Sequence, residues 1–188
     1  CIEAYTVQLH QPITDALALK GISMIAENLE KAYENGEDRE ARRNMMIAST
    51  IGGMAFISSN VGAVHAFAET VGAWFDTPHG VANSLFLPYI MEFNIPACPE
   101  RFADIADAMG IEREESMSDE QYALKAVEYV KALNRKLNIP TIKEIKGITE
   151  ERFEAIAERS ANNVLSNDNA RKITKEDYLE LLKKAYNE

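Results

Sequence analysis

The chain has few of the residues that typify secreted or membrane-spanning proteins. Only two of its 188 residues are cysteine, Cys1 and Cys98, so they make no disulfide framework and fit a reducing compartment. No apolar run approaches the roughly 20 residues that span a bilayer, and no signal peptide is recognisable. We therefore expect a cytoplasmic protein without a membrane partner.

Positive charge is also scarce. The chain has 30 Asp and Glu against 20 Lys and Arg, which gives a formal net charge of −10. Contacts with nucleic-acid phosphates need clustered Lys and Arg, so this balance argues against nucleic acid as a partner. The acidic residues are spread along the whole chain, and we interpret them as a solvated surface.

Glycine is not arranged as a phosphate-binding loop. Gly52, Gly53 and Gly62 stand in helical stretches, where we interpret them as close-packing positions. A glycine-rich turn that opens a helix is the usual site for the phosphates of a dinucleotide. The sequence therefore offers no nucleotide site of its own, and cofactor-binding residues stay unassigned.

Helical periodicity fills most of the chain. Apolar residues recur at three- and four-residue intervals, Thr14 and Thr174 stand where helix caps are expected, and Ser118 with Gln121 forms a capping box. No alternating strand pattern occurs, and 188 residues suffice for one core. We expect one all-α domain over residues 1–188, a helical bundle of about seven to nine helices. The main expected helices span 15–33, 39–58 (buried at its centre), 62–71, 81–93, 100–109, 119–137, 149–161 and 175–186.

Histidine is rare, yet two of the three histidines fall in one short stretch. His65 lies in the alanine-rich helical run 62–71, and His79 lies just before the run 81–93, so the two flank the turn of a helical hairpin. Imidazole is the commonest protein ligand of transition metals. Without HExxH or CxxC spacing, such a pair more often consists of ordinary core or helix-end residues. On the residues alone, both interpretations stay open.

The longer string 60–94 resembles the metal-binding signature of the iron-containing (group III) alcohol dehydrogenases. That signature runs roughly G-x-x-H-A-x-A-H-x-x-G-(x5)-P-H-G-x-x-N-(x4)-P-x-(x3)-F-N. The segments 1–25 and 169–177 resemble further parts of the family, so the resemblance covers nearly the whole chain. The matching central positions are Gly62, His65, Ala66, Ala68, Gly72, Pro78, His79, Gly80, Asn83, Pro88, Phe93 and Asn94.

The resemblance implies a dehydroquinate synthase-like C-terminal domain of a two-domain dehydrogenase. In the family one Asp and three His hold the metal, Fe²⁺ with Zn²⁺ as the alternative. Two of these histidines fall on His65 and His79, whereas the Asp and the first His would precede Cys1. NAD(H) or NADP(H) would bind an absent N-terminal nucleotide-binding domain, the expected partner. We expect a fragment that is inactive alone and could form a homo-oligomer through its exposed interdomain face.

The same resemblance implies further site residues. Phe56 matches an aromatic position of the substrate cavity, with plain core packing as the alternative. Glu69 stands where the family usually has another histidine, so it is the candidate catalytic group, with a metal ligand or a solvated rim carboxylate as alternatives. Leu165 replaces a common cysteine of the substrate pocket. Asn83 is expected to support its helix or a metal ligand, and His10 to lie at the surface or between domains.

The implied function is hydride exchange between a small alcohol or aldehyde and a nicotinamide, with the metal polarising the substrate oxygen. Two alternatives remain open. One is a zinc-dependent relative such as glycerol dehydrogenase or 3-dehydroquinate synthase, which the identity of the metal would separate. The other is a non-catalytic helical interaction module, which a lack of metal binding in the intact protein would favour.

Overall fold

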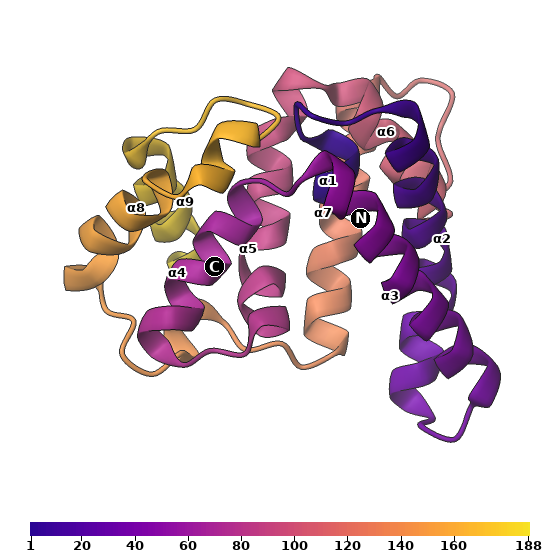
Figure 1. The fold of residues 1–188 in the computed structure, drawn as a ribbon, viewed down its shortest axis with the longest axis horizontal. Helices are drawn as coiled ribbons and strands as arrows, with labels where there is room; N and C mark the ends of the chain where they lie inside the picture. The colour runs from indigo at the N-terminus through magenta and orange to yellow at the C-terminus, as the bar shows by residue number, and fades with distance from the viewer. The chain divides into compact units, whose positions relative to one another are not determined.

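The computed structural model describes residues 1–188 as nine α-helices and four short 3-10 helices, without strands (Figure 1). The all-α prediction is therefore confirmed. The contacts divide the chain into two compact units. Unit 1 comprises Cys1–Asn60 and Ile95–Ala126, and unit 2 comprises Val61–Asn94 and Val127–Glu188. The expectation of a single domain over the whole chain stays a prediction, and each unit is described by itself.

Unit 1 is built on a long helical hairpin. Helices α2 and α3 lie side by side, and α1 and α6 pack against α2 (Figure 1). The side-chain amide of Asn44 on α3 donates to Oδ1 of Asn28 on α2 at 3.0 Å, which links the two long helices. The elements of unit 1 are α1 (Ile2–Thr6), α2 (Pro12–Glu34), α3 (Arg39–Ser59), the 3-10 helix η1 (Ile95–Ala97), α6 (Pro99–Ala108) and the first turns of α7 (Asp119–Lys136).

Helix α2 begins three residues before the expected start. Its N-cap is Gln11, whose side-chain oxygen accepts a hydrogen bond from the Ile13 N–H at 3.0 Å. The Thr14 hydroxyl accepts one from the Gln11 N–H at 3.1 Å, so the two side chains form a reciprocal capping box. The prediction of Thr14 as the cap is wrong, because it counted only the short side chains that usually occupy this position.

Helix α3 has nearly the predicted bounds but not the predicted burial. Phe56 and Ile57 in its apolar second half are 47% and 81% exposed. The buried positions are instead Ala41, Ala48 and Ala55, which recur every seven residues and so share one side of the helix. The expectation of a buried centre was wrong because α3 packs through a ridge of small residues, which leaves its larger apolar side chains outside.

The remaining helix boundaries agree with the predicted ones where a capping box begins the helix. They differ from the prediction in the short segments. The capping boxes of Ser118 with Gln121 and of Thr174 with Asp177 are both present. The expected helix 149–161 is a 3-10 turn followed by α8, and the expected polar loop 162–171 contains a 3-10 helix. Helix α1 was not predicted, because five residues carry too little periodicity.

The state of the two cysteines agrees with what the sequence predicts. Cys1 and Cys98 are free thiols, so the chain forms no disulfide, as expected. Burial raises the pKa of the Cys98 thiol to about 11, which keeps it protonated at neutral pH.

No single helix is long and apolar enough to cross a membrane; only α3 and α4, taken as a bent pair, reach that length and composition together.

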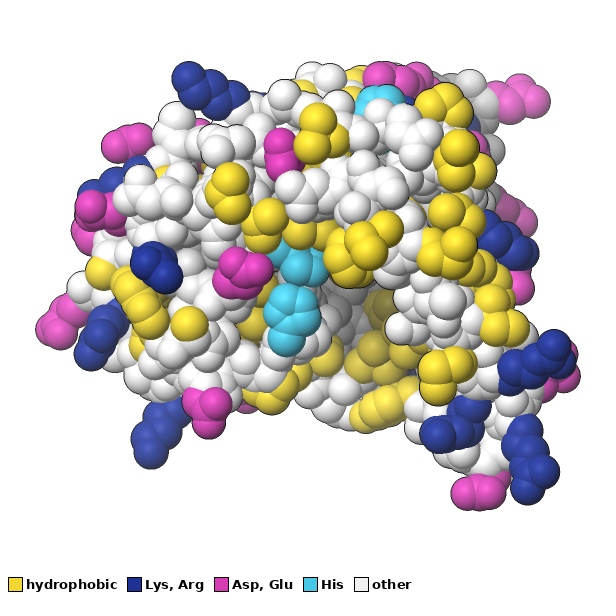
Figure 2. Space-filling view, in the orientation of Figure 1, with side chains coloured by type: hydrophobic (Ala, Val, Ile, Leu, Met, Phe, Trp, Pro, Cys, Tyr) yellow, Lys and Arg dark blue, Asp and Glu magenta, His cyan; other side chains and the backbone are white.

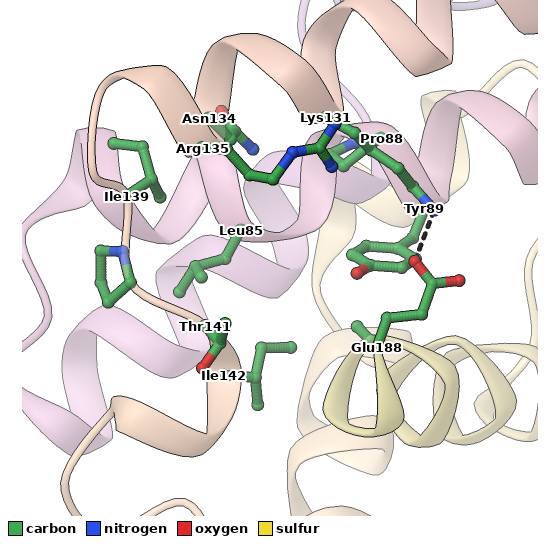
Figure 3. Close-up of a pocket in the computed structure, with 12 residues that line it drawn as sticks. Leu85, Pro88, Tyr89, Lys131, Asn134, Arg135, Ile139, Thr141, Ile142 and Glu188 are labelled. Carbon is green, nitrogen blue, oxygen red and sulfur yellow. Dashed lines mark hydrogen bonds and ion pairs between the residues drawn. The ribbon is translucent and has the colours of Figure 1, made fainter.

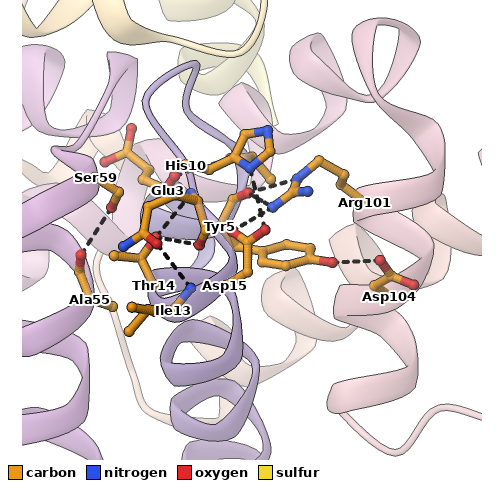
Figure 4. A network of polar contacts seen from close by, with 12 residues as sticks. Glu3, Tyr5, His10, Ile13, Thr14, Asp15, Ala55, Ser59, Arg101 and Asp104 are labelled. Carbon is orange, nitrogen blue, oxygen red and sulfur yellow. Dashed lines mark hydrogen bonds and ion pairs between the residues drawn. The ribbon is translucent and has the colours of Figure 1, made fainter.

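A polar network joins α1, α2 and α6 (Figure 4). Arg101 on α6 donates twice to the carbonyl oxygen of Tyr5 and pairs with Asp15 at 2.7 Å, and its guanidinium carbon lies 3.9 Å from the centre of the Tyr5 ring. The Tyr5 hydroxyl donates to Asp104. Burial and this acceptor raise the pKa of Tyr5 above its ordinary value. His10 is exposed, as expected, with Nδ1 3.3 Å from Asp15.

Replacing Arg101 with alanine should destabilise unit 1. The side chains of Arg101 and Asp15 are only 17% and 21% exposed, so water compensates poorly for the lost hydrogen bonds and the unpaired carboxylate. We expect the free energy of unfolding to fall by about 2–4 kcal/mol in Arg101→Ala, as measured by urea denaturation. The control Arg42→Ala, at an exposed position of α3, should change it by less than about 0.5 kcal/mol. Equal losses in both variants would contradict the role of the network.

Unit 2 carries an aromatic core between α4, α5 and α9. The Phe67 ring stacks on Phe86 with centroids 3.6 Å apart and meets Tyr178 edge-on at 5.3 Å. All three are essentially buried, so α4 is held by the face opposite the one that carries His65 and Glu69. The elements of unit 2 are α4 (Ala63–Phe75), α5 (His79–Asn94), the later turns of α7, α8 (Phe153–Ala161), α9 (Lys175–Asn187) and the 3-10 helices η2 (Ile142–Glu144), η3 (Glu150–Arg152) and η4 (Val164–Asp168).

Pro88 interrupts the hydrogen-bond ladder of α5. Proline has no N–H, so the carbonyl oxygen of Ser84, four residues earlier, lacks its usual donor. The side-chain amide of Asn134 on α7 supplies one at 2.7 Å. The later turns of α7 are thereby attached to α5 at the point where the helix cannot satisfy its own backbone.

A double-mutant cycle tests whether Asn134 replaces the backbone donor that Pro88 lacks. Asn134→Leu leaves the Ser84 carbonyl without a donor and should lower the free energy of unfolding by about 1–3 kcal/mol. Pro88→Ala restores a backbone N–H at the helical position, so Asn134→Leu should cost clearly less in that background. Urea denaturation of the four proteins measures the coupling. If the effects of the two substitutions on the free energy of unfolding are additive, Asn134 does not replace the missing donor.

Candidate metal centre

The start of α4, two residues before His65, is fixed by a side chain from a distant part of the chain. Gly62 occupies the N-cap position and offers no side chain. Oδ1 of Asn169 instead accepts a hydrogen bond from the Ala63 N–H at 3.3 Å and one from the Asn94 amide at 3.0 Å, while its own amide donates to Oδ1 of Asn94 at 2.7 Å. This buried amide pair joins the beginning of α4 to the end of α5.

Arg171 extends the same junction. Its Nη1 donates to the carbonyl oxygen of Phe93 at 3.1 Å, and its guanidinium carbon lies 4.2 Å from the centre of the Phe93 ring. The amide of Asn169 donates to the carbonyl oxygen of Arg171 at 2.8 Å. In the sequence these positions are only matches to a family pattern. Their contact was not predictable from local patterns, because more than 70 residues separate its two sides.

His65 and His79 lie next to each other on the surface of unit 2. Their ring centroids are 5.3 Å apart and their planes are inclined by 53°; Figure 2 shows them as two adjacent cyan side chains. Two imidazole nitrogens about 2.0–2.1 Å from one ion, at a tetrahedral angle, place the ring centroids roughly 5 Å apart. The hairpin therefore gives the pair the spacing of two ligands of a single ion.

Asn83 lies one helical turn after His79 and contacts it twice. Its amide nitrogen is 3.0 Å from Nε2 of His79 and donates to the carbonyl oxygen of His79 at 3.0 Å. Its Oδ1 is buried without a hydrogen-bond partner. Asn83 is thus placed to orient the His79 ring, one of the two roles expected for it. Coordination through Nε2 would require the amide to release that nitrogen.

Glu69 and Leu165 are connected through one residue that the sequence analysis missed. The Asn163 amide donates to Oε2 of Glu69 at 2.7 Å, and Oδ1 of Asn163 accepts from the Leu165 N–H at 3.0 Å, where it caps η4. Glu69 is exposed on α4, one turn after His65. The only signal of this contact in the sequence is an asparagine near the start of the polar segment 162–171.

The two histidines could supply part of a metal centre. No third His, Cys, Asp or Glu joins the two histidines to form a cluster of three possible ligands. Two neutral imidazoles suit a divalent transition metal such as iron or zinc. This pair of donors therefore fits such an ion.

Phe56, the remaining predicted pocket residue, lies in unit 1, whereas the histidine pair, Glu69 and Leu165 lie in unit 2. Its 47% exposure on α3 argues against plain core packing. The structure therefore brings together the polar site residues and Leu165 within one unit, and it presents Phe56 on the surface of the other.

The chain is similar to known proteins over nearly its whole length. Residues 1–186 match the family model described as the Fe-containing alcohol dehydrogenase family, C-terminal. Alcohol dehydrogenase 4 of Saccharomyces cerevisiae is 40% identical over 99% of this chain and 47% of its own length. The 1,3-propanediol dehydrogenase of Citrobacter freundii is 37% identical over 98% of this chain and 48% of its own length. The chain thus spans about half the length of the curated relatives it matches.

Solved structures show the same similarity. A crystal structure of 1,3-propanediol oxidoreductase matches 98% of this chain with 48% of its own, at a TM-score of 0.94 and 37% identity. The alcohol dehydrogenase from Oenococcus oeni matches with the same coverage and TM-score at 39% identity. Both confirm the helical fold and the resemblance inferred from the signature around the two histidines. The chain belongs to the iron-containing alcohol dehydrogenase family and corresponds to its C-terminal part.

Proposed function

We propose that this chain is the metal-holding helical part of an NAD(P)-dependent oxidoreductase of small alcohols or aldehydes. The observation that carries the proposal is the 5.3 Å separation of the His65 and His79 rings, within a chain of this family. Its relatives include an NADPH-dependent butanol dehydrogenase of Clostridium saccharobutylicum and an NAD-dependent methanol dehydrogenase of Bacillus methanolicus. Their names support a short alcohol as the substrate class and either nicotinamide as the cofactor.

When bound, a divalent metal supplies a Lewis acid that polarises the substrate oxygen for hydride exchange with the nicotinamide. His65 and His79 would each hold this ion through one neutral imidazole nitrogen, and the Asn83 amide would leave Nε2 of His79 where that nitrogen is the ligand. The chain has no glycine-rich phosphate loop. We therefore assign nucleotide binding to a separate N-terminal domain, in the part of the relatives that these residues do not span.

Glu69 is the proton acceptor in this proposal. It follows His65 by four residues, so both side chains project from the same face of α4. The hydrogen bond from Asn163 holds the carboxylate in one orientation and leaves its second oxygen available to a substrate hydroxyl or a water. Through its cap on η4, Asn163 also sets the position of Leu165, which we assign to the wall of the substrate pocket.

Metal titration tests whether the histidine pair is a site. Under anaerobic conditions, calorimetric titration of Fe²⁺ or Zn²⁺ into the chain should show saturable binding of one ion. His65→Ala and His79→Ala should each abolish it, because a single imidazole holds a transition metal too weakly. His10→Ala, a histidine of unit 1, is the matched control and should bind as the unsubstituted chain does. Unchanged binding in either of the first two variants would refute the proposed site.

The role of Glu69 is tested in the two-domain enzyme. Glu69→Gln keeps a hydrogen-bond acceptor for Asn163 but cannot take a proton, so kcat should fall about 100-fold or more while KM changes little. Glu69→His supplies another proton acceptor at this position and should retain turnover. Steady-state kinetics over a range of pH measure both variants. An unchanged kcat in Glu69→Gln would make Glu69 a solvated carboxylate at the rim of the site.

A further inference from the structure

Unit 2 contains a pocket of about 240 Å³ that neither histidine of the metal centre lines (Figure 3). It lies where α5, the later turns of α7, the segment that leads into η2 and the end of α9 meet. Pro88 lines it, so the pocket opens beside the break in the α5 ladder. Its volume is below the roughly 300–1,000 Å³ of pockets for drug-sized ligands, which restricts it to a smaller molecule.

One part of the pocket is apolar. Figure 3 shows Leu85, Ile139 and Ile142 at the same end of it. Leu85 and Ile142 belong to the core of unit 2, and Ile139 packs against that core. An apolar group placed there would remain in contact with rigid, largely buried side chains. The full apolar lining consists of Leu85, Pro88, Ile139, Pro140, Ile142 and Ala185.

The side formed by α7 carries two cations. Lys131 and Arg135 are four residues apart, so their like charges lie on one face of the helix, an arrangement that is unfavourable without an anion. Lys131 is paired with Glu188 and lies 4.9 Å from the centre of the Tyr89 ring. Arg135 is exposed and has no carboxylate partner, and its guanidinium extends along the pocket toward Lys131 (Figure 3). One positive charge of the pair is therefore not neutralised.

We propose that this pocket binds a small amphipathic carboxylate, with its carboxylate on Arg135 and its apolar body against Leu85, Ile139 and Ile142. The planar guanidinium donates two parallel hydrogen bonds to a carboxylate. In a chain of net charge −10, an unpaired arginine over an apolar pocket selects for an anion with an apolar portion. The proposal does not depend on the function assigned to the metal centre.

The other polar groups favour a monoanion over inorganic phosphate. Glu188 lies in the pocket lining beside Lys131 and would repel a second negative charge. The Tyr89 hydroxyl is already hydrogen-bonded to Glu188, and burial together with this carboxylate raises the pKa of Tyr89 to about 12. Arg135 can therefore serve one carboxylate, whereas a phosphate dianion would lack donors for its remaining oxygens.

The probe is hexanoate, titrated into the ¹⁵N-labelled chain and followed by amide chemical shifts. We expect saturable shifts at pocket positions such as Tyr89 and Ile142. Arg135→Gln should weaken binding about tenfold or more, because a charge-assisted bidentate contact is lost. Arg152→Gln, which removes an exposed arginine elsewhere in unit 2, should leave the affinity unchanged. Glu188→Gln should tighten binding several-fold, because it frees Lys131 for the ligand.

Matched ligands separate the contributions of charge and apolar surface. The alcohol 1-hexanol keeps the tail without the carboxylate and should bind at least tenfold more weakly than hexanoate. Inorganic phosphate should not produce saturable shifts. The proposal is overturned by an absence of saturable hexanoate binding, by equal affinities of Arg135→Gln and Arg152→Gln, or by phosphate or 1-hexanol binding as tightly as hexanoate.

Discussion

The amide pair of Asn169 and Asn94 is the interaction on which the histidine pair depends. It joins the first N–H of α4 to the last residue of α5, and these two helices carry His65 and His79. Both asparagines are 2% exposed, so each hydrogen bond is made away from water, where an unmet partner would be costly. The two helices that carry the rings are therefore held together at a junction that touches neither ring.

Several positions of the metal-binding signature acquire a structural meaning from this arrangement. Asn83 contacts the second histidine, Pro88 creates a backbone gap that a neighbouring helix fills, and Phe93 with Asn94 ends α5 at the junction. In the proposed centre, only His65 and His79 of these positions would meet the ion. The remaining positions hold the helices that carry the two histidines.

The sequence predicted what local patterns encode. The helices at Ser118 and Thr174 follow from capping boxes that involve residues three apart, and the histidine pair followed from one hairpin and its resemblance to a family. The burial of α3 was misjudged because an apolar run has the same appearance whether alanines or larger side chains face the core. The contact between Asn163 and Glu69 joins residues 94 apart. No local periodicity specifies such a contact, so only the fold could reveal it.

The position of Asn163 also bears on how such a site can change over evolutionary time. One side chain caps η4 at Leu165 and, through its other end, holds the Glu69 carboxylate. In the proposed enzyme, a shift of η4 that reshapes the pocket wall would displace the proton acceptor as well. Substitutions that broaden substrate range are therefore expected to arise at Leu165 itself, with Asn163 retained, or else to appear together with a compensating change at position 69.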